Sequence, residues 1–398
     1  MIAGAKMAYE VAVAGVGITA FGKFLPRSVR SLAEEAVNAA LENAGIGGEM
    51  IDQIYFSNAA SGLITGQEMI RGQAALKFTG LLGKPILNVE NACASSSSAF
   101  YLAYQAVSAG QVDFALVIGA EKLTHADRQT SLAVFGKAVD LEEALPPAIG
   151  AGSGSIFMDI YAEKTRKYME QTGATREDFA RIVVKSRRAG ALNEHAQFRQ
   201  PISIEEVLAA RIISEPLTLP MCSAIGDGAA AVVLCSKGAL RKLTSPRPVW
   251  VAGSALVSGF AAPEADNCAT RISRHVYEQT GIGPADLHVV ELHDASAPAE
   301  LIHYENLGLC GKGEGPALLR SGATDIDGRV SVNPSGGLLS RGHPIGATGA
   351  AQIVEIVTQL RGEAGRRQRR GAKVGMAENN GGQIGGDAAA AVATVLIR

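Results

Sequence analysis

The chain contains two similar segments, and this internal repeat constrains its fold more than any other feature. Residues 44–57 read AGIGGEMIDQIYFS, and residues 280–293 read TGIGPADLHVVELH. An apolar stretch ending in small residues precedes each copy at nearly the same separation, 11–17 before the first and 249–253 before the second. Self-similarity of this kind indicates that one structural unit occurs twice.

Strands alternate with helices in both halves. In the first half, the pattern predicts a short buried strand at 85–89, a helix with one apolar face and a strand at 114–118. In the second half it predicts a strand at 330–332, an equivalent helix with Ile353, Ile356, Val357 and Leu360 on one face, and a strand at 373–377. Nearly continuous apolar strands favour parallel or mixed sheets that helices cover on both faces. We therefore expect an α/β protein with two packed halves, 1–245 and 246–398.

Residues from about 120 to 225 break this symmetry. The stretch is longer than the matching connection in the second half, is richer in charge, and has its own helical pattern from Met158 to Gln171. Long connections of this kind carry function more often than the elements they join. We expect an inserted lobe that lies over the active site or at a subunit contact.

Composition excludes several classes of protein. With 37 Lys and Arg against 39 Asp and Glu, the chain has no basic excess for a nucleic-acid surface. Its five cysteines are odd in number, widely spaced and never in a C-x-x-C motif, which argues against disulfides and against a metal site. No window is apolar enough to span a membrane, and no targeting segment is evident, so we expect a cytoplasmic protein.

Cys93 follows a predicted strand and comes one residue before four serines and a helix. Unpaired N–H groups and the helix dipole at such a position favour a thiolate and lower the pKa of a free thiol from roughly 8.5. Cys93 is therefore a candidate nucleophile with a lowered pKa. The alternative interpretation is a small buried residue, because cysteine is among the most frequently buried types.

His343 lies in a glycine-rich turn, RGHPIGATG, that precedes the second-half helix. The repeat makes this turn the counterpart of the Cys93 turn, so two packed halves would bring an imidazole to a thiol. A cysteine–histidine pair is a common way of activating a nucleophile. The alternative is a histidine that caps a tight loop.

His293 follows the predicted strand 289–292, at the strand end where open α/β sheets bind ligands. An imidazole there can donate a hydrogen bond to a developing oxyanion, whereas the alternative is a solvated loop histidine.

Other catalytic signatures are missing from the sequence. It contains no G-x-S-x-G, Walker A or H-E-x-x-H motif, and glycines 15, 17 and 22 have the wrong spacing for a dinucleotide loop.

Several motifs together resemble those of the thiolase superfamily, and of its sterol-carrier-protein-type branch in particular. They are ENACAS at 90–95, GAEK at 119–122, GDGAAAVV at 226–233, ELHD at 291–294 and NPSGGLLSRGHPIGATG at 333–349. The resemblance implies a duplicated thiolase fold of five layers, α-β-α-β-α, in a homodimer or a dimer of dimers. It also implies coenzyme A as co-substrate without a permanently bound cofactor, and a possible small zinc-ribbon/OB-fold accessory subunit.

The same resemblance assigns roles to particular residues. Cys93 is expected to carry the acyl group of a 3-oxoacyl-CoA in thiolysis or in the reverse Claisen condensation, and His343 to take its proton. His293 and His343 are expected to donate to the enolate oxygen, and the backbone N–H groups of Cys93 and Gly382 to the tetrahedral oxyanion. The family's second catalytic cysteine is missing, because its two usual places hold Ala295 and the thiol-free stretch 377–382.

The missing cysteine leaves the proton donor open, and we expect His293 or Glu378 to replace it. A pocket without that cysteine suits a bulky or aromatic substrate such as a benzoylsuccinyl-type thioester. Lys185, Arg187 and Arg188 are candidates for binding the CoA phosphates, although basic residues on a helix are more often simply solvated. The alternative function is a non-catalytic subunit that binds acyl-CoA or lipid.

Overall fold

Ten strands form the centre of the molecule in the computed structural model, which describes residues 10–143, 146–147, 149–150, 155–262 and 264–398. Their order is β10-β9-β11-β12-β8-β1-β7-β4-β2-β3. The first-half strands are β1 (Val11–Ile18), β2 (Gln53–Ser57), β3 (Ile86–Val89), β4 (Phe114–Glu121) and β7 (Gly228–Ser236). The second-half strands are β8 (Val249–Ser258), β9 (Val289–Glu291), β10 (Ser331–Val332), β11 (Val374–Gly381) and β12 (Ala390–Ile397).

The strand order shows the duplication directly. Outward from the centre, the first half runs β1, β7, β4, β2, β3, and the second half runs β8, β12, β11, β9, β10 in the equivalent sequence. The pairings correspond as well, because β4–β2–β3 and β11–β9–β10 are parallel whereas the pairs next to the centre are antiparallel. The two halves meet where β1 pairs with β8, at Ala12 opposite Trp250 and Val13 opposite Val249.

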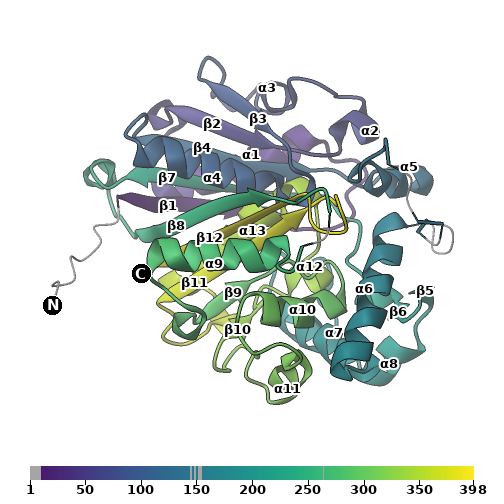
Figure 1. Cartoon of the computed structure of the whole chain (residues 1–398). Helices are drawn as coiled ribbons and strands as arrows, with labels where there is room; N and C mark the ends of the chain where they lie inside the picture. Colours follow the sequence, from purple (N-terminus) through teal and green to yellow (C-terminus); the bar gives the residue numbers. More distant parts are fainter. Residues whose placement is uncertain (1–9, 144–145, 148, 151–154, 263) are drawn as a thin grey trace, which may run out of the picture.

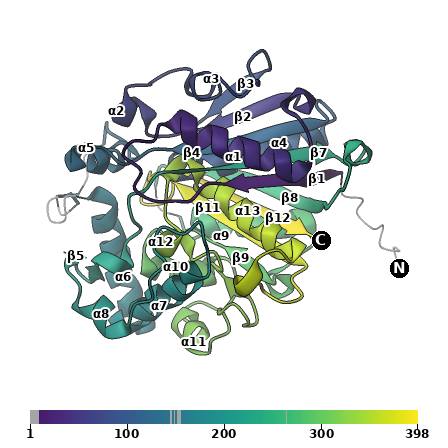
Figure 2. The ribbon, with the colours of Figure 1, turned by 180° about the vertical axis from the view of Figure 1, so that it is seen from behind.

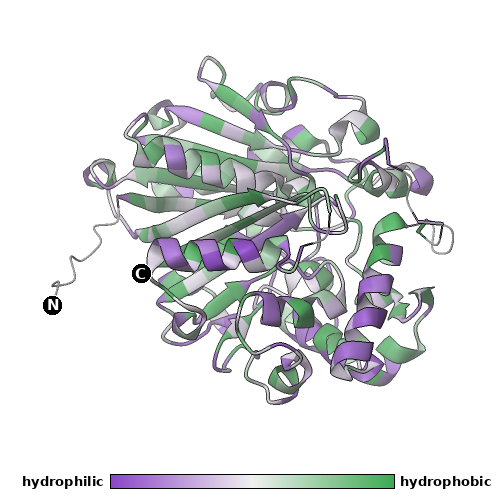
Figure 3. Ribbon diagram, viewed as in Figure 1, coloured by the Kyte–Doolittle hydropathy of each residue, from purple (hydrophilic) through white to green (hydrophobic). Residues whose placement is uncertain are grey.

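Helices complete five layers, as predicted (Figures 1 and 2). α1 (Val29–Ala44) covers the outer face of the first half, and α9 (Cys268–Thr280) covers that of the second. Between them lie α4 (Ser95–Ser108) and α13 (Thr348–Arg361), which pack on each other and each contact strands of both halves. Figure 3 shows the same division, with mostly hydrophobic strands inside and mixed colours along the outer helix α9.

Capping and burial explain these helices. The Ser28 hydroxyl accepts from Ser31 N at the start of α1, and Gly45 ends the helix in the left-handed conformation at φ 67°. α13 is buried almost all round, which suits a helix enclosed between two sheets.

One first-half strand differs from expectation. β3 was predicted as a buried strand, but it lies at the edge of the sheet, and Leu87 is 39% exposed. Burial along this strand depends on what covers the sheet edge, which a short apolar stretch does not reveal. In the same half, α2 (Ser61–Thr65) and α3 (Arg71–Ala75) complete the fold near that edge.

The predicted insertion lies between β4 and β7 and extends down the right side of Figure 1. It contains α5 (Arg128–Ala133), α6 (Ile156–Thr172), α7 (Arg176–Ala191), α8 (Ile204–Ala209), β5 (Ile212–Ser214) and β6 (Leu217–Thr218). α6 and α7 pack on α10 (Ala297–Asn306), and α7 also contacts α11 (Gly315–Arg320) and α12 (Gly337–Ser340). Within the described part of the chain, no helix is long and apolar enough to cross a bilayer.

Candidate active site

A cavity of about 640 Å³ lies where the inserted lobe meets the layered core. Cys93, His293 and His343 line it from the core, and Phe135, Met158, Tyr161 and Lys164 line it from the lobe. The lobe therefore forms one wall of this cavity.

The Cys93 turn is held by its own sequence. Residues 92–94 form a short 3-10 turn that leads into α4, and Ala92 adopts φ 47°, a left-handed conformation that alanine rarely takes. The Ser95 hydroxyl accepts from Asn91 N at 2.9 Å and donates to Ala92 O at 2.6 Å. The serine run thus braces the turn that presents the sulfur.

The segment around Cys93 packs closely on two second-half segments, the start of α13 and the end of β11, because glycines leave room there. A Cβ on Gly349 would lie 1.9 Å from Ser97 Oγ, and a Cβ on Gly381 would lie 2.0 Å from Asn91 O. The Ser96 hydroxyl also accepts from Ala350 N at 2.9 Å and so supplies a hydrogen-bond partner to the first turn of α13. Residues far apart in sequence are joined here by direct packing.

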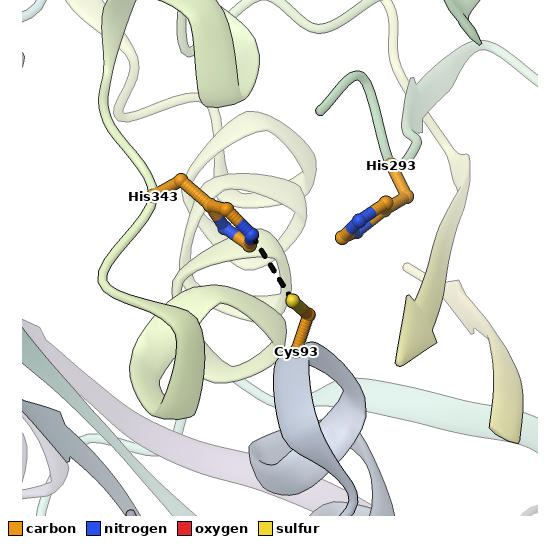
Figure 4. A group of neighbouring side chains, drawn as sticks. All are labelled: Cys93, His293 and His343. Carbon is orange, nitrogen blue, oxygen red and sulfur yellow. Dashed lines mark hydrogen bonds between the residues drawn. The ribbon is translucent and has the colours of Figure 1, made fainter. Parts of the chain in front are cut away.

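The thiol of Cys93 faces the imidazole of His343, and Sγ lies 3.2 Å from Nε2 (Figure 4). The other ring nitrogen, Nδ1, lies 2.7 Å from Thr348 Oγ1, which donates its hydrogen to Pro344 O at 3.1 Å. Because that hydroxyl has one hydrogen to give, it accepts from Nδ1–H. Nε2 therefore carries the lone pair and accepts the proton of Cys93.

The resting pair is neutral, which corrects the expectation of a lowered cysteine pKa. Burial, and next the Glu121 carboxylate, raise the pKa of Cys93 to about 12, although the backbone N–H groups of Cys93 and Gly382 lower it. Burial, followed by the Arg341 charge, lowers the pKa of His343 to about 3. The helix N-terminus does favour the thiolate, but desolvation has the larger effect.

His293 completes the group. Its ring lies edge-on to that of His343 with centroids 5.3 Å apart, and Figure 4 shows both rings beside the sulfur. Burial is the main cause that lowers the pKa of His293. Its Nδ1 is buried and has no hydrogen-bond partner among the described residues.

Glu378 lies behind His293, inside the protein. Its Oε2 accepts from His293 N at 3.1 Å and lies 3.6 Å from Nδ1 of His303, whereas Oε1 has no partner within the described ranges. Ala295 lines the cavity, and Gly382 lies at the end of β11 in the left-handed conformation at φ 63°. The structure thus brings together Cys93, His343, His293, Gly382 and Glu378.

The sequence did not indicate two residues of this site, His303 and Tyr161. His303 is on α10, three residues after the buried Glu300, and lines the cavity together with Asn380. Tyr161 is on α6, and burial raises the pKa of its phenol, which therefore stays protonated. The only sign of them in the sequence was a polar residue on the inner face of each of these two helices.

The three basic residues proposed for CoA lie elsewhere. Lys185 Nζ is bonded inside the protein to Glu300, to Tyr304 Oη at 3.1 Å and to Val332 O at 3.2 Å. Arg187 stacks over the ring of Phe198 at 4.0 Å, and Arg188 is exposed away from the cavity. The basic residues that do line the cavity are Lys164 and Lys167.

The core trio also has the composition of a metal site. One ligand atom from each of Cys93, His293 and His343 lies within 4.8 Å of the other two. A soft ion such as Zn²⁺ binds this donor set. Such an ion would occupy the lone pairs needed for proton transfer, so metal binding and nucleophilic attack exclude one another.

A thiol and an imidazole on facing turns of a duplicated α/β fold define a class of enzyme that acts through a cysteine nucleophile. Comparison of the chain with known families identifies the class more closely. The model described as "Thiolase, N-terminal domain" matches residues 11–238, and "Thiolase C-terminal domain-like" matches residues 261–396. The chain belongs to the thiolase superfamily and is an acyltransferase of the thiolase type, which uses acyl-CoA substrates.

Individual relatives agree with this assignment. The chain is 41% identical to the benzoylsuccinyl-CoA thiolase subunit BbsB of Thauera aromatica, over 90% of this chain and 91% of the relative. It is 39% identical to an acetyl-CoA acetyltransferase of Methanothermobacter thermautotrophicus, over 96% and 98% of the two chains. It is 35% identical to sterol carrier protein 2 of Bos taurus, over 95% of this chain and 70% of the relative, which confirms the predicted branch.

Among solved structures, the Ltp2-ChsH2(DUF35) aldolase has a TM-score of 0.80 and 26% identity, with 99% of each chain covered.

Proposed function

We propose that this protein cleaves a 3-oxoacyl-CoA by thiolysis, or forms one by the reverse Claisen condensation, through an acyl group on Cys93. The observation that carries the proposal is the 3.2 Å contact between Cys93 Sγ and the unprotonated Nε2 of His343 in the wall of a substrate-sized cavity. A neutral pair of this kind is converted into a nucleophile when the proton moves to Nε2 during attack.

The reaction begins when the sulfur bonds to C3 of the substrate and its proton passes to His343. Backbone N–H groups of Cys93 and Gly382 stabilise the oxyanion of the tetrahedral intermediate. When this intermediate collapses, the C2–C3 bond breaks. The acyl group stays on Cys93, the electron pair goes to C2 of an acyl-CoA enolate, and C2 takes a proton from a second acid–base group. That group then removes the proton of the CoA thiol, which attacks the acyl-cysteine. The released Cys93 sulfur recovers its proton from His343.

Protonation of the enolate carbon needs a group that replaces the family's second cysteine. We assign this step to His293 together with Glu378, because His293 lines the cavity beside Cys93 and the Glu378 carboxylate accepts from His293 N behind it. General acid–base groups contribute about 10²–10⁴-fold to a rate. Glu378→Gln and His293→Asn are each expected to lower thiolysis by about 100-fold; if both leave it within twofold, the assignment is wrong.

Intact mass spectrometry tests the covalent step. After incubation with acetoacetyl-CoA, the wild type is expected to gain the mass of an acetyl group, and Cys93→Ala to gain none. Cys222→Ala is the matched control, because this second free thiol does not line the cavity and its loss should leave the adduct in place. Binding of acyl-CoA without any adduct would instead identify a non-catalytic binding subunit.

We infer that the substrate has a bulky acyl group, because part of the cavity wall is apolar. Phe135, Phe157, Met158 and Ile302 line this part, and Ala295 adds no bulk where the branch has a cysteine. The name of the Thauera relative, a benzoylsuccinyl-CoA thiolase subunit, agrees with a large aromatic thioester. Thiolysis assays with acetoacetyl-CoA and with aryl 3-oxoacyl-CoA esters test this preference.

We also propose that the chain works in an assembly. One relative is named as a subunit and the solved neighbour contains a DUF35 protein, which supports a small zinc-ribbon/OB-fold accessory subunit. The exposed edge strand β3 supports a homodimer. The five cysteines are free, which suits a reducing, cytoplasmic setting. Light scattering of the chain alone and of the co-expressed pair measures both associations.

A further inference from the structure

The end of the cavity beyond Tyr161 contains an ammonium group that the proposed reaction does not use. Lys164 lies three residues after Tyr161 on α6, so the two side chains share one face of the helix and both line the cavity. Tyr161 interacts electrostatically with Cys93, and Lys164 lies one helical turn further along the same wall of the cavity. Among the described residues, Lys164 Nζ makes one hydrogen bond, to the neutral Gln383 Oε1 at 3.5 Å.

Two other inward-facing lysines show how this protein normally accommodates such a charge. Lys122 Nζ lies 3.3 Å from Asp227 Oδ2, and Lys185 Nζ is bonded to Glu300, in both cases with a buried carboxylate. Within the part of the chain that the structure describes, Lys164 has no carboxylate at ion-pair distance. A partly buried charge without a counterion is costly unless a ligand supplies one.

Two acidic residues also line the cavity, and neither forms an ion pair with Lys164 in the described part of the chain. The Asp387 carboxylate is held by backbone N–H groups, since it accepts from Cys268 N at 2.6 Å and from Ala388 N at 2.7 Å. Glu264 also lines the cavity but is exposed to solvent. Burial lowers the pKa of Lys164, whereas Asp387 and Glu163 raise it. A bound carboxylate would raise it further.

We propose that Lys164 binds a carboxylate at the far end of the acyl group, so that the substrates are 3-oxoacyl-CoA thioesters whose transferred acyl chain is itself an acid. This inference rests on the proposed function, because it takes Cys93 as the point of attachment. The same ammonium would also attract a phosphate of CoA. The two sources differ, because every CoA ester has the phosphates and only an acidic acyl chain has the carboxylate.

The test compares two ligands of equal chain length on a protein that cannot react. Cys93→Ala is titrated calorimetrically with glutaryl-CoA and with pentanoyl-CoA, which differ in a terminal carboxylate in place of a methyl group. We expect glutaryl-CoA to bind about tenfold more tightly, as a charge-assisted hydrogen bond provides. The preference should disappear in Cys93→Ala/Lys164→Met and be largely kept in Cys93→Ala/Lys164→Arg.

Lys167→Met is the matched control, because Lys167 lines the same cavity but is exposed and paired with Glu163 at 2.7 Å. It should leave the preference intact. Equal binding of the two ligands by Cys93→Ala overturns the proposal. An equal loss of affinity for both ligands in Lys164→Met also overturns it and assigns Lys164 to the CoA phosphates.

Failure of the proposed function has a different signature. The glutaryl-CoA preference would persist in the binding experiment, while the wild type would form no acyl adduct on Cys93 with 3-oxoadipyl-CoA.

Discussion

The two halves of the molecule connect equivalent strands in very different ways. In the second half, a short loop, 382–389, joins β11 to β12, whereas residues 122–227 join the corresponding β4 and β7 of the first half. The short loop contributes the Gly382 backbone to the site, and the long connection contributes the lobe with Tyr161 and Lys164. The duplicated frame thus positions the reacting groups, and the one asymmetric connection determines what lies beside them.

The two facing turns differ in a similar way. One presents a sulfur at the cavity, and the other holds an imidazole that is 3% exposed and bonded on its far side to Thr348. Duplication placed both turns at the same kind of strand-to-helix junction. They differ in side chain, and the proposed reaction needs both a thiol and an imidazole, which two identical turns would not provide.

Replacing His343 is expected to have the largest effect on the rate, because the imidazole is the part of the pair that takes the proton in the proposed reaction. His343→Gln should lower kcat/KM for thiolysis by about 10³–10⁴-fold, because it removes both the proton acceptor and a donor to the enolate. Thr348→Val, which removes only the partner of Nδ1, should cost about tenfold by loosening the tautomer. Alkylation of Cys93 by iodoacetamide at pH 8 provides an independent measure. If kcat/KM of His343→Gln stayed within tenfold of the wild-type value, the reaction would not depend on the pairing of the two turns.

Contact between the turns should be nearly as sensitive. Gly349→Ala places a Cβ against Ser97 in the first turn of α4, and Gly381→Ala places one against Asn91 O beside Cys93. Each should lower the free energy of unfolding by about 1–3 kcal/mol and reduce acylation. Gly136→Ala is the control, since its Cβ would have ordinary contact at 3.5 Å. Urea unfolding measures the difference. Equal stability of Gly136→Ala and Gly381→Ala would show that the turns are not tightly packed.

Much of this frame was predictable from local signals. The repeat and the alternation of strands and helices indicated the duplicated five-layer fold, and the glycine-rich turn around His343 marked a close approach of backbone. The pairing of Cys93 with His343 followed from placing equivalent turns face to face. Each of these inferences depends on neighbouring residues or on the repeat itself.

What was missed depends on packing between distant segments. The raised pKa of Cys93 results from burial in the assembled site, and the sequence around the thiol indicated the opposite direction. Lys185 meets Glu300 through contact between α7 and α10, so it did not remain available for CoA. His303 and Lys164 become site residues only because α10 and α6 enclose one cavity.

The buried imidazole should leave a mark on stability in acid. Because its pKa is lowered to about 3 in the folded protein, His343 contributes stability that is complete above its unfolded value near 6.5 and is lost as the pH falls from there toward 3. The wild type should therefore lose stability between pH 6.5 and 4, and His343→Asn should lose less. Thermal unfolding at both pH values tests this, and parallel curves for the two proteins would contradict it.

The smallest expected effect comes from a substitution on the face of the lobe that points away from the cavity. Arg188 lies on an exposed face of α7, whereas α6 faces the cavity, so Arg188→Ala should leave the KM for CoA within twofold of the wild type. Its unfolding free energy should change by no more than about 0.5 kcal/mol, as for surface positions in general. An increase in KM of tenfold or more would show that CoA extends across the outer face of the lobe. The binding surface would then be larger than the cavity that the two halves and the lobe enclose.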